Sequence, residues 1–551
     1  MISKKQARAI IKSNFGRNPV ETGISFYDAT SRMDKIRVYH DEMMKEKTTE
    51  SGYIDDITWD DLEMDDVFLR INHTDSFAGE QILYHKLHEV GRNDFKLQSN
   101  SEGVNKDTNE SIEEKVKFVT ENPQIREKME TNLFAVGKTK NDYHMVSFLK
   151  NADIWKIEHA WALYVMQVLL AVFIVTSIIF QNIVCYAGLI MVALANLLIY
   201  TVTKKKYAAF FDSIGDFKRV YDFAAWVTKD EKLDQVYGSD EVKAAVDKLK
   251  GMSNTIVNFN TRQQGTLSGD LSAVLLDYIF GITLFDVTMF NKVMKKIENK
   301  LDEVISLIEF TGEIDMTISI ASYRESLDMW CIPEFEKAYE ESKKAKIKAE
   351  SLVHPLLSSP VANDFDLDDW AIITGANASG KSTFMKAFAI NVIMAQTINT
   401  CTAQQFFTTH MHVMTCMSLR DDILSGESYY FREARYLKRM IDEIDSGNRV
   451  LCVVDEILKG TNTHERIAAS KAILDYIAKD NCFVLIATHD MELTEDAHYT
   501  KFYFDSTVQD NDIVFDYKIH SGIGGKSNAI ALLEILGYPK TIVEQARINQ
   551  R

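Results

Sequence analysis

Residues 375–383 read Gly-Ala-Asn-Ala-Ser-Gly-Lys-Ser-Thr and directly follow the apolar run 370–374. The pattern G-x-x-x-x-G-K-[ST] is typical of a phosphate-binding loop when it stands between a buried strand and a helix. The run supplies the strand, and the segment 384–390 continues with apolar residues at helical spacing. The stretch therefore predicts an α/β fold built around a loop that binds a nucleoside triphosphate.

The residue types of this loop match the needs of a polyphosphate. Two glycines let backbone N–H groups approach the phosphates at the positive end of the following helix. Lys381 is expected to reach the β- and γ-phosphates, and the Ser382 hydroxyl to ligate Mg²⁺. We expect the nucleotide contacts to come from Gly375, Asn377, Ser379, Gly380, Lys381, Ser382 and Thr383.

Two later apolar runs end in residues suited to hydrolysis. The run 450–454 ends in Asp455-Glu456, a Walker B arrangement about 70 residues after the loop. We expect Asp455 to hold Mg²⁺ and Glu456 to orient and deprotonate the attacking water. The run 482–487 leads into Thr488-His489-Asp490, where His489 is expected to sense the γ-phosphate or polarise the water, a surface histidine being the alternative. The predicted catalytic residues are Glu456, His489 and Lys381.

Between these runs, Ser425-Gly426-Glu427-Ser428 opens a predicted helix. A Ser-Gly turn at a helix start offers backbone N–H groups and a hydroxyl to an anion. In ATPases whose sites form between two subunits, such a segment reaches the partner's γ-phosphate. We expect Ser425, Gly426 and Ser428 to act in this way in a homodimer, with a capped helix start as the alternative.

Length and composition limit the class of protein. A chain of 551 residues is too long for one hydrophobic core and implies several domains. Hydrophobic residues make up 46% of a chain with only 6 prolines, which suits a folded and largely helical protein. The net charge of −18 argues against a generally basic surface that coats nucleic acid. The six cysteines form no C-x-x-C pair and suit reduced thiols in the cytosol.

A stretch without charge lies in the middle of the chain. Between His159 and Lys204 there is no Asp, Glu, Lys, Arg or His, and the Gln-Asn pair 181–182 separates two apolar blocks, about 160–180 and 184–203. A helix of roughly 20 residues matches the ~30 Å hydrocarbon thickness of a bilayer. The pattern predicts a two-helix transmembrane hairpin. A buried hairpin in a soluble core is the alternative, but such helices normally keep a polar face.

The residues that flank this hairpin predict its orientation. Lysines precede it at 150 and 156 and follow it at 204–206, so the positive-inside rule places both flanks in the cytoplasm. Inside the blocks, Gln167, Thr176, Ser177 and Asn196 are candidates for hydrogen bonds between the two spans, or tolerated single polar residues.

The remaining segments predict helices and then a mixed α/β region. Residues 1–150 are polar and mostly helical in pattern. Residues 207–350 predict long amphipathic helices, for example 301–310 and 334–351, and the lysines near the end of the second suit a solvated face. From about residue 352, short apolar runs alternate with helical segments, which favours a parallel sheet.

Taken together, these segments resemble the MutS family of mismatch-repair ATPases, a branch of the ABC-type nucleotide-binding fold. The resemblance rests on 374–383, 425–433, Asp455-Glu456 with 460–463, and Ala487-Thr488-His489. The stretches 354–356 and 361–364 resemble the family's lead-in to the ATPase strand, and 526–530 and 536–546 its closing dimerisation region; weaker similarity lies at 72–79. It implies ATP and Mg²⁺ as ligands, a dimer, and helical levers upstream of the ATPase.

The resemblance also suggests a division of the chain. We expect an N-terminal helical segment (1–59), a helical core and lever region in two parts (60–158 and 204–351) that flank the membrane hairpin (159–203), and a C-terminal P-loop ATPase domain with a dimerisation region (352–551). Departures from the family pattern bear on function. No Phe-x-Glu wedge occurs in the first hundred residues, and alanines stand at 376 and 378 where the family usually has Pro and Met.

These expectations describe a membrane-anchored, MutS-like ATPase whose hydrolysis moves levers, with both soluble parts cytoplasmic. Two partners are open. The family resemblance favours DNA, whereas the net charge of −18 and the missing wedge favour a mechanochemical module that acts on a protein and never meets DNA. A transporter fits less well, because no ionisable residue marks a pathway through the spans.

Overall fold

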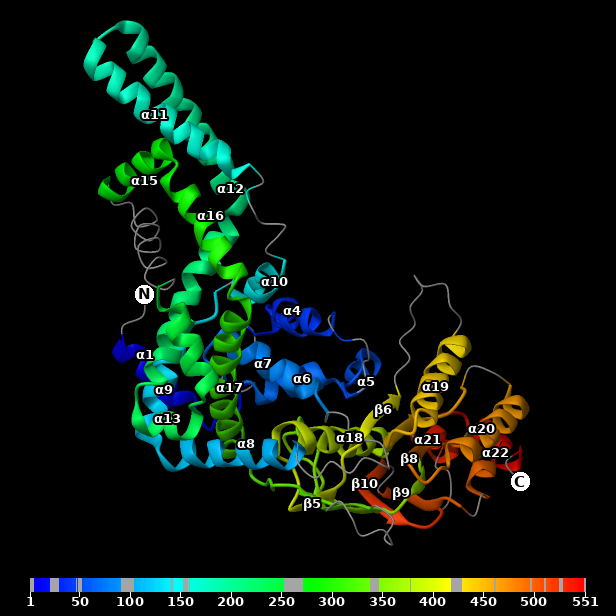
Figure 1. Cartoon of the computed structure of the whole chain (residues 1–551). Coiled ribbons are helices and arrows are strands. Elements are labelled where there is room, and N and C mark those ends of the chain that lie inside the picture. The colour runs from blue at the N-terminus through cyan, green and yellow to red at the C-terminus, as the bar shows by residue number, and fades with distance from the viewer. Residues whose placement is uncertain are drawn as a thin grey trace.

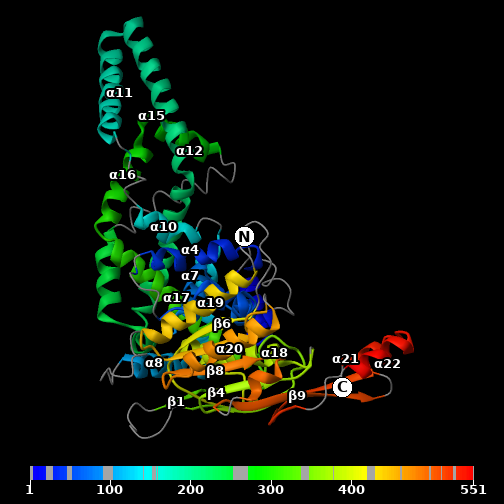
Figure 2. The ribbon, with the colours of Figure 1, turned by 90° about the vertical axis from the view of Figure 1, so that its right-hand side faces the viewer.

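The computed structural model describes residues 4–19, 29–45, 47, 52–90, 104–139, 142–151, 157, 159–251, 271–336, 346–376, 378–417, 429–459, 462–495, 498–509, 512–524 and 529–549. Within them a helical body, a projecting helical hairpin and an α/β region can be distinguished (Figures 1 and 2). This confirms the prediction of a helical N-terminal region with two apolar helices, followed by an α/β region.

The helical body combines segments from both sides of the hairpin. Its helices include α1 (Lys4–Asn14), α4 (Met33–Met44), α5 (Asp56–Asp61), α6 (Met64–Ile71), α7 (Phe77–His88), α8 (Val104–Glu121), α9 (Pro123–Val136), α10 (Met145–Lys150), α13 (Glu231–Tyr237), α16 (Phe285–Glu298) and α17 (Leu301–Glu325), with a helical stretch over 240–251 and a 3₁₀ turn η1 (Asp142–His144). At its centre α17 packs along α7. Asp315 of α17 accepts hydrogen bonds from the Ser76 hydroxyl (2.5 Å) and the Ser76 N–H (2.7 Å), so it caps the start of α7.

Two glycines allow this close packing of α7 and α17. A Cβ atom added to Gly312 would lie 2.7 Å from the carbonyl oxygen of Ala78, and one added to Gly79 would lie 2.2 Å from a carboxylate oxygen of Asp315. Neither distance is compatible with van der Waals radii. The two helices can therefore keep this separation only while both positions lack a side chain.

We expect Gly312→Ala to destabilise the protein by about 1–3 kcal/mol, the usual cost of adding a group to a packed core. The matched control is Gly251→Ala, at the end of the helical stretch 240–251, because a Cβ atom there has none of the described residues within 4 Å and helix propensity favours Ala over Gly by about 0.5–1 kcal/mol. Thermal unfolding of the detergent-solubilised protein compares the two variants. Equal melting temperatures for both would contradict the close packing of α7 and α17.

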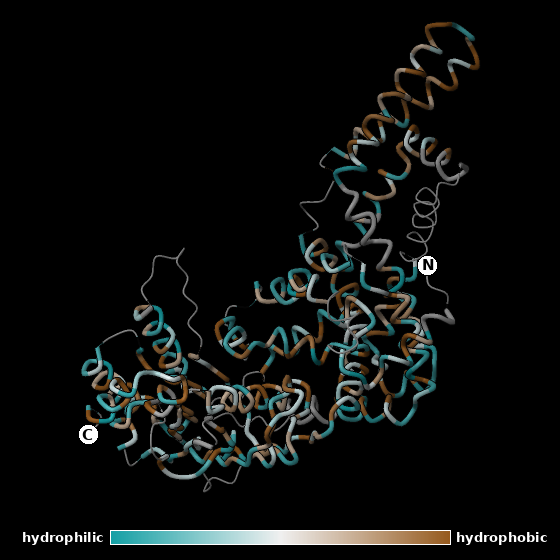
Figure 3. The backbone as a smooth tube through the Cα atoms, turned by 180° about the vertical axis from the view of Figure 1, so that it is seen from behind, coloured by the Kyte–Doolittle hydropathy of each residue, from teal (hydrophilic) through white to brown (hydrophobic). Residues whose placement is uncertain are grey.

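The hairpin consists of α11 (Ala160–Phe180) and α12 (Ile183–Val227). Both helices are long and apolar enough to cross a bilayer, over Ala160–Phe180 and Ile183–Lys206, and only 17% and 22% of their most apolar windows are buried. They project from the body as two hydrophobic rods (Figure 3). The alternative was a hairpin buried in a soluble core. The hairpin is instead exposed in this structure: Ile178, Ile183 and Met191 are 69%, 81% and 68% exposed.

The second apolar block does not end at the lysines. Helix α12 is continuous for 45 residues and enters the helical body, where Phe217, Val220 and Ala224 are buried. On its α12 side the hairpin is thus joined to the body by an uninterrupted helix.

The prediction of a helix over 334–351 is wrong where the structure describes these residues, because they form strands. The strands are β1 (Glu334–Phe335) and β2 (Ile347–Leu352); residues 337–345, which include Lys343 and Lys344, lie outside the described residues. Over the first four residues of β2 the side chains of Ile347 and Ala349 are buried, while Lys348 and Glu350 are exposed. This alternation has the period of a strand, and it competes with the helical pattern of the lysine-rich stretch.

The C-terminal region contains two sheets among the described residues. One has the order β10-β9-β4-β8-β7-β6 and the other β1-β5-β2-β3. The remaining strands are β3 (Asn363–Leu367), β4 (Trp370–Thr374), β5 (Gln405–Thr408), β6 (His412–Cys416), β7 (Val450–Asp455), β8 (Cys482–Ala487), β9 (Thr500–Gln509) and β10 (Asp512–Ser521). Strands β9, β4, β8, β7 and β6 are parallel, as predicted, but β10 is antiparallel to β9, so the sheet is mixed.

Helices cover both faces of the six-stranded sheet. Helix α18 (Lys381–Ile398) packs on one face against Ile373, Val453 and Leu485. Helices α19 (Tyr429–Asp445) and α20 (Thr463–Ile477) pack on the other face, against the alternate residues Ile372, Val454 and Ile486. Because successive side chains of a strand point to opposite faces, these continuous apolar runs require two helical layers.

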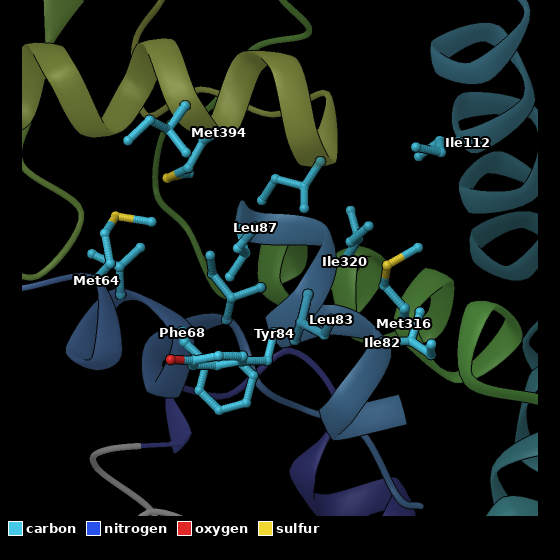
Figure 4. Packing of buried hydrophobic residues seen from close by; sticks show 14 of the residues in the cluster. Met64, Phe68, Ile82, Leu83, Tyr84, Leu87, Ile112, Met316, Ile320 and Met394 are labelled. Carbon is cyan, nitrogen blue, oxygen red and sulfur yellow. The ribbon is translucent and has the colours of Figure 1, made fainter. Parts of the chain in front are cut away.

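Helix α18 also belongs to the core of the helical body. Its Met394 packs in one buried cluster with residues of α6, α7, α8 and α17, as Figure 4 shows for Met64, Phe68, Ile82, Leu83, Tyr84, Leu87, Ile112, Met316 and Ile320. The helix that follows the glycine-rich loop is therefore shared by the α/β region and the helical body.

Candidate functional site

The glycine-rich loop lies between β4 and α18, where the sequence predicts it. Gly375 and Gly380 have φ values of +147° and +102°, which L-residues with side chains rarely adopt. A Cβ atom on Gly375 would lie 2.8 Å from the carbonyl oxygen of Phe504. Helix α18 begins at Lys381 without a side-chain cap, so its first N–H groups face the loop unpaired by a capping side chain.

Lys381 is buried and turned onto the loop itself. Its Nζ donates to the carbonyl oxygens of Gly375 (2.7 Å) and Ala376 (3.0 Å). Burial lowers the pKa of this ammonium group, partly offset by Asp455 and Glu456. These carbonyl contacts hold the cation at the loop, where a phosphate oxygen would be a stronger partner.

Ser379 carries a polar atom that suits a ligand. The residue is 1% exposed, and its hydroxyl has no hydrogen-bond partner among the residues that the structure describes. Buried polar groups are nearly always paired, so a hydroxyl of this kind at a glycine-rich loop fits a bound phosphate. Thr383 is exposed at the start of α18, and Asn377 lies outside the described residues.

Ser382 and Asp455 come together although they are far apart in the chain. The Ser382 hydroxyl lies 2.5 Å from a carboxylate oxygen of Asp455, the last residue of β7. A hydroxyl and a carboxylate are oxygen ligands that Mg²⁺ accepts. Among the described residues, no three His, Cys, Asp or Glu side chains form a metal site. This donor set fits Mg²⁺, which takes most of its other ligands from phosphates and water.

Glu456 and His489 form a pair beside these oxygens. The Nε2 atom of His489 lies 2.9 Å from one carboxylate oxygen of Glu456, and the Nζ of Lys459 lies 3.3 Å from the other. The hydrogen bond with His489, opposed by partial burial and supported by Lys459, lowers the pKa of Glu456 to about 2. Glu456 is therefore ionised, and its positive φ of +59° turns the backbone at the strand end.

The strand order explains why these residues meet. Strand β8 lies between β4 and β7, and all three are parallel, so their carboxyl ends share one edge of the sheet. The loop, the Asp455-Glu456 pair and His489 each follow one of these strands. A cavity of about 720 Å³ opens at this edge, and its lining includes Ser379, Lys381, Ser382, Asp455 and Glu456.

Other residues that line the cavity were not identified from the sequence as part of a site. They include Phe504 of β9, Tyr517 of β10 and His354. Burial lowers the pKa of His354 to about 4, so this imidazole is neutral at neutral pH. Tyr517 is 46% exposed and lies beside Gly380. A Cβ atom added to Gly380 would lie only 3.1 Å from the Tyr517 ring. Tyr517 lies where the register between β10 and β9 shifts, so it gives no periodic signal in the sequence. It reaches the cavity because β10 pairs with β9 and β9 pairs with β4.

The predicted trans-acting residues Ser425, Gly426 and Ser428 lie outside the described residues, in the segment between β6 and α19. Gly460 and Thr461, which follow the Asp455-Glu456 pair in the sequence, also lie outside the described residues.

Comparisons with known proteins place the site in a family context. Residues 371–551 match the family model described as MutS domain V. The chain is 29% identical over 272 residues to the DNA mismatch repair protein MutS of Pseudothermotoga lettingae, a match that covers 47% of this chain and 32% of that protein. It is 25% identical over 351 residues to the protein of the same description from Thermosipho melanesiensis, covering 58% and 42%. A third such protein, from Exiguobacterium sp., is 33% identical over 196 residues, covering 34% and 23%. The chain spans less than half the length of these curated relatives.

Proposed function

Because the chain belongs to the MutS family through its domain V at residues 371–551, we propose that it is a membrane-anchored ATPase that works as a dimer and couples hydrolysis to movement of its helical body. The observation that carries the proposal is the meeting of Lys381, Ser382, Asp455 and Glu456 around one cavity at the carboxyl edge of the sheet. In this proposal 1–59 is an N-terminal helical segment, and 60–158 and 204–351 are the two parts of the helical core and lever region. The membrane hairpin is 159–203, and the ATPase domain is 352–551.

The roles of the site residues follow from their positions. The loop N–H groups, Ser379 and Lys381 bind the phosphates of ATP, and Ser382 and Asp455 hold Mg²⁺, which supplies charge neutralisation when bound. Glu456 and His489 orient the attacking water. A carboxylate whose pKa is lowered to about 2 is a weak base. Glu456 must therefore exchange its contact with His489 or Lys459 for the water before it can accept a proton.

The route from the site to the helical body runs along α18. The helix begins at Lys381 and ends at Ile398, and beyond it Arg324 of α17 donates to the Asn399 carbonyl (2.8 Å) and to the Thr400 hydroxyl (2.9 Å). The same guanidinium pairs with Glu113 of α8 at 3.0 and 2.9 Å. A displacement of the loop end of α18 is thereby passed to α8 and α17.

A second contact joins the helical body to the α/β region at the end of β6. Asp61 of α5 accepts hydrogen bonds from the Thr415 hydroxyl (2.7 Å) and the Met417 N–H (2.8 Å), at the end of β6. The segment 418–428, which contains the proposed trans-acting residues, follows directly. We propose that this contact links the partner-facing segment to the helical body.

Membrane anchoring is supported by the exposed hairpin α11–α12 and its lysine-bearing flanks. We propose two spans, with the helical body and the ATPase on the cytoplasmic side. A hairpin that continues into the body through α12 ties the levers to the bilayer.

Two partners are proposed as alternatives. The relatives are described as DNA mismatch repair proteins, which favours DNA, bound through non-specific phosphate contacts. The net charge of −18 favours a protein partner in the membrane. ATPase assays of the protein in detergent, with and without single-stranded, duplex and mismatched DNA, distinguish them. Stimulation by one form, with affinity that falls as salt rises, supports DNA; no stimulation, together with a stable protein partner in pull-downs, supports the alternative.

Lys381→Ala tests nucleotide binding by the loop. Loss of a buried cation that faces phosphates is expected to weaken ATP binding at least ~10-fold, because a charge-assisted hydrogen bond contributes about 1.5–3 kcal/mol. Fluorescent ATP-analogue titration measures the change. Lys386→Ala serves as control, since Lys386 lies on α18 too, but pairs with Glu63 (3.0 Å). Equal affinities for both variants would exclude the loop as the phosphate site.

A further inference from the structure

Helix α15 (Leu271–Thr283) is an apolar helix outside the predicted hairpin. It has 13 residues and is about 20 Å long, too short to cross a bilayer. Apolar side chains are nevertheless exposed along it, with Leu275 at 64%, Tyr278 at 55% and Ile279 at 46%. The chain then turns at Leu284, which has a φ of +52°, and returns as α16 (Figure 1).

The turn between α15 and α16 is seated on the hairpin. Leu284 and Val287 form a small buried cluster with Leu163 of α11 and Tyr200 of α12, separate from the cores of the body and the sheet. Gly281 allows this approach, because a Cβ atom there would lie 2.8 Å from the Tyr200 ring.

Two amides of the hairpin cap the end of α15. The Asn196 side chain donates to the Ile282 carbonyl (2.7 Å), and the Gln167 side chain donates to the Thr283 carbonyl (2.9 Å) and approaches the Thr288 hydroxyl (3.3 Å). These residues were candidates for bonds between the two spans, but they bind this third segment instead. Thr176 bonds only within α11, and Ser177 has no partner for its hydroxyl among the described residues.

The capping is informative because helix ends exposed to water need no such partners. The last four carbonyl groups of a helix lack intrahelical donors, and water normally satisfies them. In hydrocarbon no water is available, so each unpaired group is strongly unfavourable. Asn196 is fully buried, on a helix whose outward residues are apolar. Two amides placed on α11 and α12 for these carbonyls indicate a site without water.

The distances along the helices give the depth of the turn. Asn196 lies eight residues before Lys204, or about 12 Å along α12. Gln167 lies seven residues after Ala160, or about 10 Å along α11. On the far side of the turn, Lys292 comes eight residues after Leu284, again about 12 Å away. The lysines of α12 and α16 are thus level with one another, and the turn lies a third or more of the way into a ~30 Å hydrocarbon layer.

Two acidic residues belong to this segment. Asp277 lies on α15, six residues or about 9 Å along the helix before Thr283. Asp286 lies in the first turn of α16, where the positive end of the helix dipole favours a carboxylate.

We propose that α15 and the first turns of α16 form a re-entrant segment, which enters the cytoplasmic leaflet beside the hairpin and returns to the same side. This inference rests on the proposed membrane anchoring of α11 and α12. The occupant of the exposed face of α15 is lipid hydrocarbon, because that face continues the exposed apolar surface of the hairpin. The helical body is then held to the bilayer by α16 as well as by α12.

Lipid photocrosslinking tests the segment in the full-length protein. A benzophenone amino acid is placed singly at Tyr278 on α15, at Ile178 near the hairpin tip, or at Leu536. Leu536 is 65% exposed and directly follows α21 (Ala529–Ile535), which lies far from the hairpin (Figure 1). The variants are reconstituted in bilayers that contain labelled phosphatidylcholine. We expect lipid adducts at 278 and 178 well above the yield at 536.

The outcomes separate this inference from the anchoring itself. Adducts at 178 with only the background yield at 278, or protein adducts at 278, would overturn the re-entrant segment and leave the hairpin in the membrane. Background yield at 178 would overturn the anchoring and the inference with it.

The amide caps are tested in the same assay. Asn196→Leu combined with Gln167→Leu should reduce the adduct at 278 to background while the adduct at 178 persists. Thr176→Val is the matched control, because it removes a hydrogen bond within α11 only. An unchanged yield at 278 in the double variant would show that the two amides do not hold the segment.

Discussion

Glutamine in place of Glu456 is expected to leave ATP binding intact and to lower the turnover rate by about 10²–10⁴-fold, the usual contribution of a positioned general base. The side chain keeps its size and its place at the end of β7, but it loses the charge that pairs with His489 at 2.9 Å. In the proposed site, binding depends on the loop, on Lys381 and on Ser382, none of which this change removes. Single-turnover hydrolysis and equilibrium nucleotide binding, measured on the same detergent-solubilised preparation, separate the two effects.

The matched control is Glu534→Gln, because Glu534 is a half-exposed residue whose ion pair with Arg547 lies away from the cavity. It should turn over as the unaltered protein does. Full activity in Glu456→Gln would remove Glu456 from the reaction. Loss of nucleotide binding in that variant would instead assign it to the binding step.

Methionine in place of Arg324 is expected to lower the free energy of unfolding by about 2–4 kcal/mol, within the range for breaking buried charged hydrogen bonds. Arg324 of α17 has a side chain only 4% exposed and contacts three residues in two other segments: Glu113 of α8, and Asn399 and Thr400 after α18. Methionine retains the apolar stem, so the loss reports on the guanidinium. Thermal and denaturant unfolding measure it.

The same variant tests whether the ATPase is coupled to the helical body. With the guanidinium gone, the end of α18 loses its polar link to α8 and α17, so nucleotide should change the protease sensitivity of the helical body less than it does in the unaltered protein. Arg547→Met is the control, since its ion pair with Glu534 is 56% exposed on both sides and such pairs contribute only about 0–1 kcal/mol. If Arg324→Met equals Arg547→Met in stability and in its response to nucleotide, Arg324 does not link α18 to α8 and α17.

Local pattern was sufficient for the elements that carry the candidate site. The apolar runs predicted at 371–374, 450–454 and 482–487 correspond to β4, β7 and β8, and the loop and α18 follow as expected. A buried strand, a glycine turn and a helix each depend on residues close in sequence, so their signals can be read without the fold. The two apolar helices were equally clear, because their character is a property of about 20 consecutive residues.

The errors and omissions arose where one pattern competed with another or where no pattern exists. The stretch 334–351 contains both a lysine-rich helical texture and the alternation of β2, and pairing with β3 and β5 selects the strand. Tyr517 reaches the cavity only because β10 pairs with β9, and β9 with β4.

The sequence by itself determined that this chain has a glycine-rich loop between a strand and a helix, an Asp-Glu pair at the end of a later strand, and a charge-free pair of helices. Only the tertiary structure decided that α18 is shared between the sheet and the helical body, that Arg324 joins three segments, and that Gln167 and Asn196 cap α15 rather than each other's helices. The physical reason is that composition and periodicity act over one or two turns of chain. The partner of a buried polar group is chosen by whichever distant backbone the packing brings within about 3 Å of it.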